Sequence, residues 1–108
     1  DMYGVQSSLH FSEGLPAVIN EKPACDIARE AALAVTDENL VTSQGNPSFG
    51  GEDFAFYLQQ VNGCMVRFGA RMAGAGVVHS STYNFDEKAL IYGAKWLANA
   101  AMRWQARQ

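Results

Sequence analysis

The C-terminal stretch, residues 86–108, constrains the fold more than any other part of the chain, because its pattern predicts one long helix. Asp86 is a good N-cap, and Phe85 and Leu90 are placed for a hydrophobic staple. Apolar residues then recur at helical spacing as one continuous stripe, which we expect to face a core. The stripe comprises Leu90, Ala94, Leu97, Ala101 and Trp104. The residues expected to face water are Lys95, Asn99 and Arg103. A coiled-coil seam is the alternative, but the stripe spans only about two heptads.

Two further helices are expected upstream. Pro23 suits a first helical turn, where its missing N–H would be unpaired anyway, and the alanine-rich CDIAREAALAV that follows is a strong helix former. After the glycines of FGGEDF, Phe54, Leu58 and Val61 recur at helical spacing. Asn62-Gly63 predicts the end of that helix, because either residue tolerates the left-handed conformation.

Short apolar runs between the helices predict strands. Residues 5–11 alternate in polarity, which is the period of a half-buried strand, whereas residues 40–42, 64–69 and 77–78 are short and mainly apolar. Strands that alternate with helices predict an α/β fold, in which helices cover a sheet. Because the first strand differs in character from the others, we expect it to belong to another layer or another domain.

Composition limits the classes of function. The 108 residues suit one small domain, and 48% apolar with 18% charged residues is typical of a globular core. A net charge of -3 argues against nucleic acid as a partner. No apolar run approaches a membrane span, so no membrane partner is expected. The chain lacks a Met at position 1, and we expect it to be part of something longer.

The two cysteines, Cys25 and Cys64, have no CxxC spacing. No export signal is visible at the N-terminus, and disulfides are rare in proteins that stay inside the cell. Two buried, inert thiols are therefore favoured over a disulfide, and the expected compartment is the reducing cytoplasm.

Three roles are open to His79, which follows Val77-Val78: metal ligand, general base or solvated surface residue. Spacing alone favours the surface role, because a metal site needs three or four ligands and the chain has no HxxxH or HxD pair. Ser80 and Ser81 lie beside it, but the G-x-S-x-G elbow of a nucleophilic serine is absent.

Gly50 and Gly51 open the GGEDF segment. Their bare backbone would let a ligand come close, with helix N–H groups aimed at an anion. The alternative is a simple glycine turn before the acids Glu52 and Asp53, which suit the positive end of a helix dipole. Without any resemblance to a known family, the simple glycine turn is the favoured interpretation. The two acids would point about 100° apart on a helix, so they do not form a catalytic pair.

Two stretches together are more specific than any single motif: FGGEDFAFYLQQVNGCMVRFGAR and VVHSSTYNFDEKALIYGAKWLANAA. They resemble the C-terminal part of the metal-dependent amidohydrolases of the aminoacylase/carboxypeptidase family, in the branch with hippurate hydrolase and the indole-acetyl-amino-acid hydrolases. The upstream LPAVINEKPACDIAREAA is similar to that family's passage from a small dimerisation domain into the catalytic domain. Two loop positions depart from the family pattern, since Asn62 and Ser81 stand where proline is usual.

The resemblance implies a fold and a site. Residues 1–18 would hold the last strand of a small α+β dimerisation (lid) domain, and residues 19–108 the C-terminal portion of a helix-covered, mixed-sheet catalytic domain of the zinc-peptidase type. His79 would be the last ligand of a two-metal site that takes zinc, manganese or cobalt. Gly50 and Gly51 would lie beside the bound substrate. The remaining ligands and the glutamate base would come from the N-terminal part of such an enzyme, so no residue of this chain is expected to be catalytic.

The implied activity is hydrolysis of the amide bond of N-acyl amino acids or related small amides, by a homodimer. We expect the chain alone to be inactive and to bind no metal, because one histidine cannot hold a metal pair. The first alternative is a non-enzymatic module that associates through the unpaired edge of residues 5–11. The second is a small-anion site formed by His79 and the GGEDF helix, without catalysis.

Overall fold

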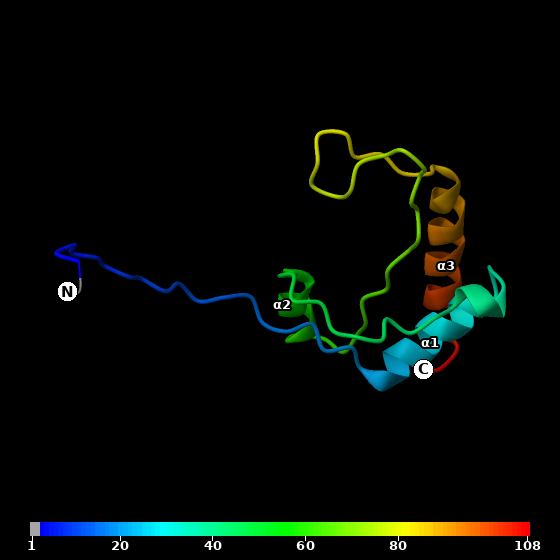
Figure 1. The fold of residues 1–108 in the computed structure, drawn as a ribbon. Coiled ribbons are helices and arrows are strands. Elements are labelled where there is room, and N and C mark those ends of the chain that lie inside the picture. Colours follow the sequence, from blue (N-terminus) through cyan, green and yellow to red (C-terminus); the bar gives the residue numbers. More distant parts are fainter. Residues whose placement is uncertain (1–2) are drawn as a thin grey trace.

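The computed structural model describes residues 3–108 and contains, in that range, three α-helices and one short 3-10 helix. These are α1 (Lys22–Leu33), η1 (Glu38–Leu40), α2 (Phe54–Leu58) and α3 (Lys88–Gln105), joined by long extended segments (Figure 1). The described residues form no strand ladder, only isolated bridges from Arg71 to Phe85 and from Gly76 to Tyr83. None of the helices in this part of the chain is long and apolar enough to cross a membrane.

The two upstream helices form where the sequence predicts them. Pro23 lies in the first turn of α1, as predicted. α2 is shorter than predicted. It ends at Leu58, whereas the spacing of apolar residues predicts a helix that continues to Val61. Only Ala55 of this helix is buried. A helix of so few residues is marginal without tertiary packing, and little packing is available here to extend it.

The start of α3 differs from the prediction by one residue. Glu87 occupies the N-cap position, which the sequence assigned to Asp86. The Asp86 carboxylate nevertheless accepts a hydrogen bond from the backbone N–H of Lys88, at 3.0 Å. Asp86 therefore satisfies one of the free N–H groups at this helix end, as a capping residue does.

α3 packs on α1 through a different face from the predicted one. The apolar stripe is largely exposed, since Leu90 is 60%, Leu97 63% and Trp104 50% accessible to solvent. The partly buried residues of α3 are Ala89, Gly93, Trp96, Asn99, Ala100 and Arg103. This face is rotated by one residue, or about 100°, from the stripe. Its small side chains let α3 approach Ala28 and Ala31 of α1, which are buried.

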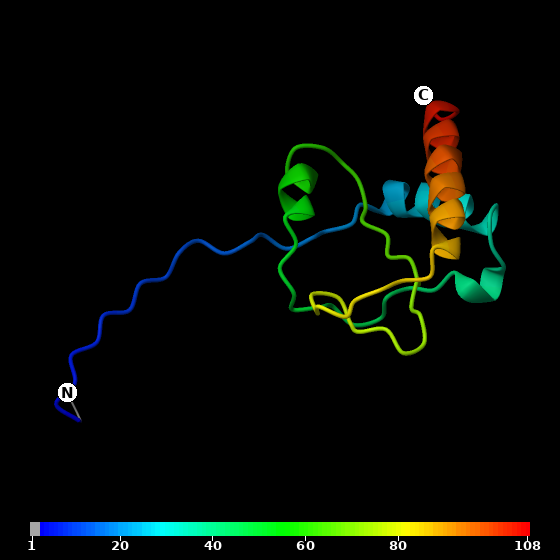
Figure 2. The ribbon, with the colours of Figure 1, turned by 90° about the horizontal axis from the view of Figure 1, so that it is seen from above.

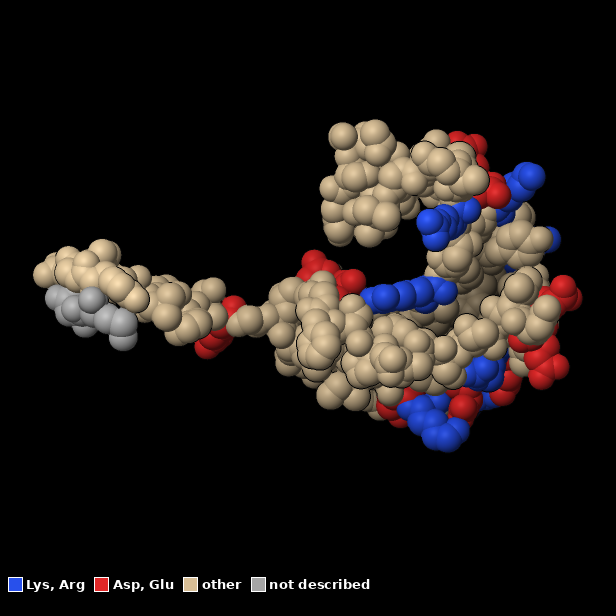
Figure 3. All heavy atoms as spheres, in the orientation of Figure 1, with Lys and Arg blue, Asp and Glu red and all other residues tan. Residues whose placement is uncertain are grey.

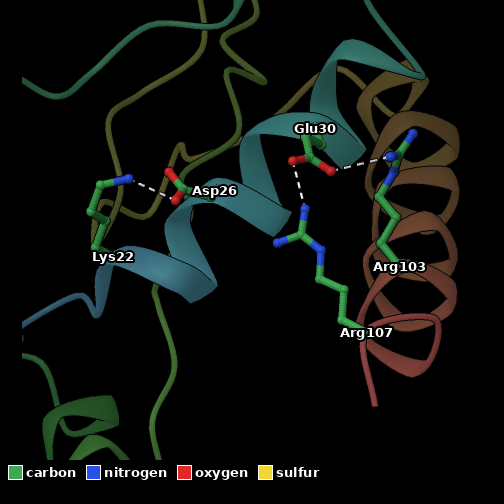
Figure 4. Close-up of polar contacts among 5 residues, drawn as sticks. All are labelled: Lys22, Asp26, Glu30, Arg103 and Arg107. Carbon is green, nitrogen blue, oxygen red and sulfur yellow. Dashed lines mark hydrogen bonds and ion pairs between the residues drawn. The ribbon is translucent and has the colours of Figure 1, made fainter.

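Polar contacts fix the two helices in register. The indole N–H of Trp96 donates to the backbone carbonyl of Ala28 at 2.9 Å. Glu30 accepts from both Arg103, at 3.3 Å, and Arg107, at 2.6 Å (Figure 4). The prediction that Arg103 and Asn99 face water is only partly right, because both lie half-buried on the side of α3 that approaches α1.

The segments predicted as strands are extended but unpaired. Residues 3–14 run away from the rest of the chain (Figures 1 and 2). Val5 is 70% exposed and Phe11 83%. A strand needs a neighbour for its backbone hydrogen bonds, and no described residue supplies one here. The radius of gyration is accordingly 19.1 Å, against about 13 Å for a compact chain of this length. The α/β sheet and the division at residue 18 stay predictions.

Trp96→Phe should lower the free energy of unfolding by about 1 kcal/mol, because phenylalanine keeps the apolar contact with α1 but cannot donate to the Ala28 carbonyl. Denaturant unfolding followed by the circular dichroism of the helices measures the change. Trp104→Phe is the matched control, since this indole is half exposed, and its effect should stay within about 0.5 kcal/mol. Equal losses for both variants would contradict the assigned role of Trp96.

Candidate functional site

His79 is carried by a closed loop, residues 70–86, that leads into α3. The base of the loop is closed by a hydrogen bond from the N–H of Asp86 to the carbonyl of Ala70, at 2.9 Å. Further along, the N–H of Gly76 donates to the carbonyl of Thr82 at 3.0 Å. The loop stands out beyond the N-terminal end of α3 (Figure 1). Because Asp86 also contacts the first turn of α3, the helix anchors one end of the loop.

A tight turn holds His79 at the tip of this loop. The N–H of Ser80 donates to the carbonyl of Val77 at 3.2 Å, so Val78 and His79 are the central residues of a β-turn. His79 has φ 67°, and no other non-glycine residue described by the structure has a positive φ. A turn of this kind normally has glycine or asparagine at that position. The exposed imidazole is thus presented from an uncommon backbone conformation, which is more frequent at functional positions than elsewhere.

Gly76 allows the loop to close. A Cβ atom at this position would collide with the hydroxyl oxygens of Ser80 and Thr82 and would lie 3.0 Å from the carbonyl carbon of Thr82. The two hydroxyls are themselves hydrogen-bonded at 3.4 Å. Sequence reasoning missed this residue, because the only available signal was a glycine in a glycine-rich loop, and the neighbours that exclude a side chain come from the far side of the turn.

Gly50 and Gly51 lie exposed in the segment before α2. Neither has a positive φ, and a Cβ atom at Gly50 would meet only Ser48 Oγ, at 3.4 Å. A Cβ atom at Gly51 would lie 2.7 Å from Leu15 Cδ1, the movable end of a flexible side chain. Neither the backbone conformation nor the packing of the described residues therefore requires glycine here.

The structure does not join the two glycines to His79, since no hydrogen bond links them in the described part of the chain. Figure 3 shows an open gap between the lobe formed by the loop and the body of the chain. The small-anion alternative gains no support. The Glu52 carboxylate already accepts from the N–H of Phe54 at 3.1 Å, and its negative charge would repel an anion at the start of α2.

Residues 3–108 hold no group of three or more His, Cys, Asp or Glu side chains that could bind a metal ion. His79 can therefore supply only one ligand, and the residues present do not make a complete metal centre. A metal bound at His79 needs donors from outside these residues.

The two thiols are free, as predicted, but only half buried. The prediction of full burial is wrong, because the buried part of α1 is the face toward α3 and Cys25 lies on another side of the helix. Cys25 and Cys64 line a groove of about 380 Å³ between α1 and the 64–67 segment. Burial, followed by the charge of Cys25, raises the pKa of Cys64 to about 11. Cys64 is therefore a protonated, weakly nucleophilic thiol at neutral pH in the reduced chain, and its inertness stays a prediction.

Comparison with known proteins shows the family to which this chain belongs. Residues 5–103 match the profile described as Peptidase family M20/M25/M40. The match covers most of the chain, and the chain therefore belongs to this peptidase family, whose members are in general metal-dependent.

Three curated relatives are similar to this chain, and two of them carry hydrolase names. The putative amidohydrolase YhaA of Bacillus subtilis is 34% identical over 110 residues, which cover 95% of this chain and 26% of the relative. An uncharacterised hydrolase of Staphylococcus aureus is 40% identical over 94 residues, covering 83% and 24%. A putative glutamate–cysteine ligase of Rhodococcus jostii is 36% identical over 98 residues, covering 88% and 12%. The chain thus spans about a quarter of the length of the two hydrolases. No solved structure matches the chain.

Gly76→Ala should open the loop, because the added Cβ cannot fit beside Ser80 and Thr82. The amide of residue 76 should then exchange with solvent at least about tenfold faster, since its hydrogen bond to Thr82 is lost. Hydrogen exchange followed by NMR measures this change, and chemical shifts should move between residues 76 and 83. Gly69→Ala is the control, because a Cβ there meets nothing within 4 Å. Unchanged exchange in the Gly76 variant would show that Gly76 does not hold the loop closed.

Cys64 should react with iodoacetamide about tenfold more slowly at pH 8 than a simple thiol does. Raising the pKa from 9.0 to about 11 lowers the thiolate fraction about 100-fold at this pH, and the greater nucleophilicity of the more basic thiolate restores about tenfold. The rate should keep rising until about pH 11, where an ordinary thiol levels off near pH 9. Alkylation at a series of pH values, with peptide mapping of each cysteine, gives both quantities. A plateau near pH 9 for Cys64 would disprove the assigned shift.

Proposed function

We propose that the chain is the C-terminal part of a metal-dependent amidohydrolase that cleaves the amide bond of N-acyl amino acids or related small amides. The observation that carries this proposal is the closed loop that presents the exposed imidazole of His79 from a left-handed turn, in a chain of a metal-dependent peptidase family. The name of the Bacillus subtilis relative, a putative amidohydrolase, supports the class of reaction. The resemblance to hippurate hydrolase supports the substrate class.

In this proposal His79 is one ligand of a centre that takes two divalent ions of zinc, manganese or cobalt. When bound, such a pair supplies an activated water and polarises the amide carbonyl. The contribution of this chain is to orient one imidazole. The β-turn from Val77 to Ser80 and the closure at Gly76 fix the backbone on which that side chain is carried. The other ligands and the general base come from outside these residues.

Gly50 and Gly51 are proposed to line the substrate site. The described structure gives no strong internal reason for glycine at either position, since neither φ is positive and a Cβ at Gly51 would displace only the flexible end of Leu15. A bound acyl-amino acid that lies against the bare backbone would supply the reason. This role rests on the resemblance and on the exposure of both residues.

The architecture proposed for the complete protein follows from the same resemblance. Residues 1–18 would add a strand to a dimerisation domain and thereby form a homodimer, and the described part of that segment is extended and exposed. Residues 19–108 would complete a mixed-sheet catalytic domain, whose other elements would cover the apolar stripe of α3. Free thiols suit a cytoplasmic enzyme.

A non-enzymatic module that associates through residues 5–11 is the alternative, and the exposure of Val5, Leu9 and Phe11 favours it as much as it favours the dimerisation strand. The coding sequence upstream of Asp1 distinguishes the two. The enzyme requires a His or Cys ligand cluster and a Glu-Glu pair there. A natural chain that starts near Asp1 would support the module instead.

The 108-residue chain should show no hydrolysis of hippurate with added zinc or manganese, and turnover would refute the proposed division of the site.

In the longer gene product, His79→Gly should lower metal content and reduce hydrolysis by about 100-fold or more, because glycine keeps the left-handed turn but removes the imidazole. His10→Gly is the matched control at the other histidine of these 108 residues and should retain both. Full activity in the His79 variant would exclude its role as a ligand.

A further inference from the structure

Three hydrogen bonds bring the segments that carry Cys25 and Cys64 together. The N–H of Glu21 donates to the carbonyl of Gly63 at 2.9 Å. The side chain of Asn20 pairs with the backbone of Met65, where it accepts at 2.8 Å and donates at 3.3 Å. Cys64 lies between the two residues that are held in this way. Cys25 lies one helical turn beyond Glu21, whose carbonyl accepts from its N–H at 3.0 Å.

The two thiols lie at this contact. Both side chains line the same groove between α1 and the 64–67 segment. After burial, the charge of Cys25 is the next cause that raises the pKa of Cys64. Both residues are partly exposed and free, so a small reagent reaches them through the open groove.

We propose that Cys25 and Cys64 are a redox-active pair that forms a reversible disulfide within the chain, with a low-molecular-weight disulfide such as oxidised glutathione as the oxidant. This inference is independent of the proposed amidohydrolase function, since it uses neither His79 nor the glycines before α2.

The exchange takes place in two balanced steps. The Cys25 thiolate attacks one sulfur of the glutathione disulfide, a mixed disulfide forms, and one glutathione thiolate leaves. The Cys64 sulfur then attacks Cys25 Sγ, the protein disulfide forms, and the second glutathione leaves. The two protons of the protein thiols pass to the two departing thiolates. The protein loses two electrons, which reduce the oxidant to two thiols. Because Cys25 is uncharged in the mixed disulfide, one cause of the raised pKa of Cys64 is removed before the second step.

The disulfide would close a loop of about 40 residues. It would join the first turns of α1 covalently to the segment that leads to the loop at residues 70–86. In the reduced chain, the hydrogen bonds of Asn20 and Glu21 make this connection without a covalent bond.

The test is to equilibrate the 108-residue chain with known ratios of oxidised and reduced glutathione, quench with acid, alkylate and map the peptides. The expected product is a Cys25–Cys64 linked peptide, with an equilibrium constant at least about tenfold higher in the folded chain than in guanidinium chloride, because folding holds the thiols together. Equal constants in the two conditions would overturn the proposal. Two separate mixed disulfides, or disulfide-linked dimers, as the main product would also overturn it.

Asn20→Ala is the matched structural variant, because it removes two of the three hydrogen bonds and leaves both thiols in place. Its equilibrium constant for the disulfide should fall by about fivefold or more. An unchanged constant would show that the Asn20–Met65 contact does not position the thiols. Cys25→Ser and Cys64→Ser each retain one thiol, which should stop at a mixed disulfide with glutathione.

Discussion

The contact between α1 and α3 is the interaction on which the rest of the structure depends. Ala28 and Ala31 are buried there, and the Trp96 indole spans the contact and donates to α1. The ion pairs of Glu30 contribute less, because the side chains involved are about 40% exposed and water screens such pairs. Burial of small side chains around one hydrogen-bonded indole is therefore what holds the helices together. Phe68 packs edge-on against Trp96, with ring centroids 5.3 Å apart, so this contact also fixes the segment that leads to the loop.

The helix pair positions the candidate site through one short connection. Asp86 contacts the first turn of α3 on one side and Ala70 on the other. The direction in which the loop leaves the body of the chain is thus set by the helix, and the shape of its tip by Gly76 and Thr82. In contrast, nothing comparable fixes residues 3–14. Among the described residues only Ile27, Ala28, Ala31 and Ala55 are buried, so apolar surface remains exposed over much of the chain. This is the expected condition of a segment that spans about a quarter of its hydrolase relatives.

Local information was sufficient to predict α1 and α3 and insufficient to predict what they contact. Helix propensity and spacing are properties of neighbouring residues, and both helices form where these predict. The face of α3 that packs was wrongly assigned, because hydrophobicity selects the large residues, such as Leu90 and Leu97. Close packing on the alanines of α1 selects the small ones, Gly93 and Ala100. Strand pairing is non-local, and the partners of residues 5–11 are not supplied by the described chain. His79 was found from its motif, whereas its left-handed conformation and the need for Gly76 depend on hydrogen bonds across the loop that spacing does not reveal.

The backbone at His79 connects the sequence departure at Ser81 with the structure. A proline at position 81 would restrict the conformation of Ser80 and thereby stiffen the turn. This chain lacks that restraint, yet His79 keeps a conformation that costs a non-glycine residue about 1 kcal/mol or more. Two consecutive turns take the place of the proline restraint: the N–H of Ser80 donates to Val77 at 3.2 Å, and the carbonyl of Ser80 accepts from Tyr83 at 3.1 Å. The Ser80 and Thr82 hydroxyls add a further contact at 3.4 Å. Ser80 takes part in every one of these bonds, so hydrogen bonds hold the turn that presents the imidazole, in place of a proline ring. Its rigidity depends on Gly76, because a side chain there would collide with the Ser80 and Thr82 hydroxyls.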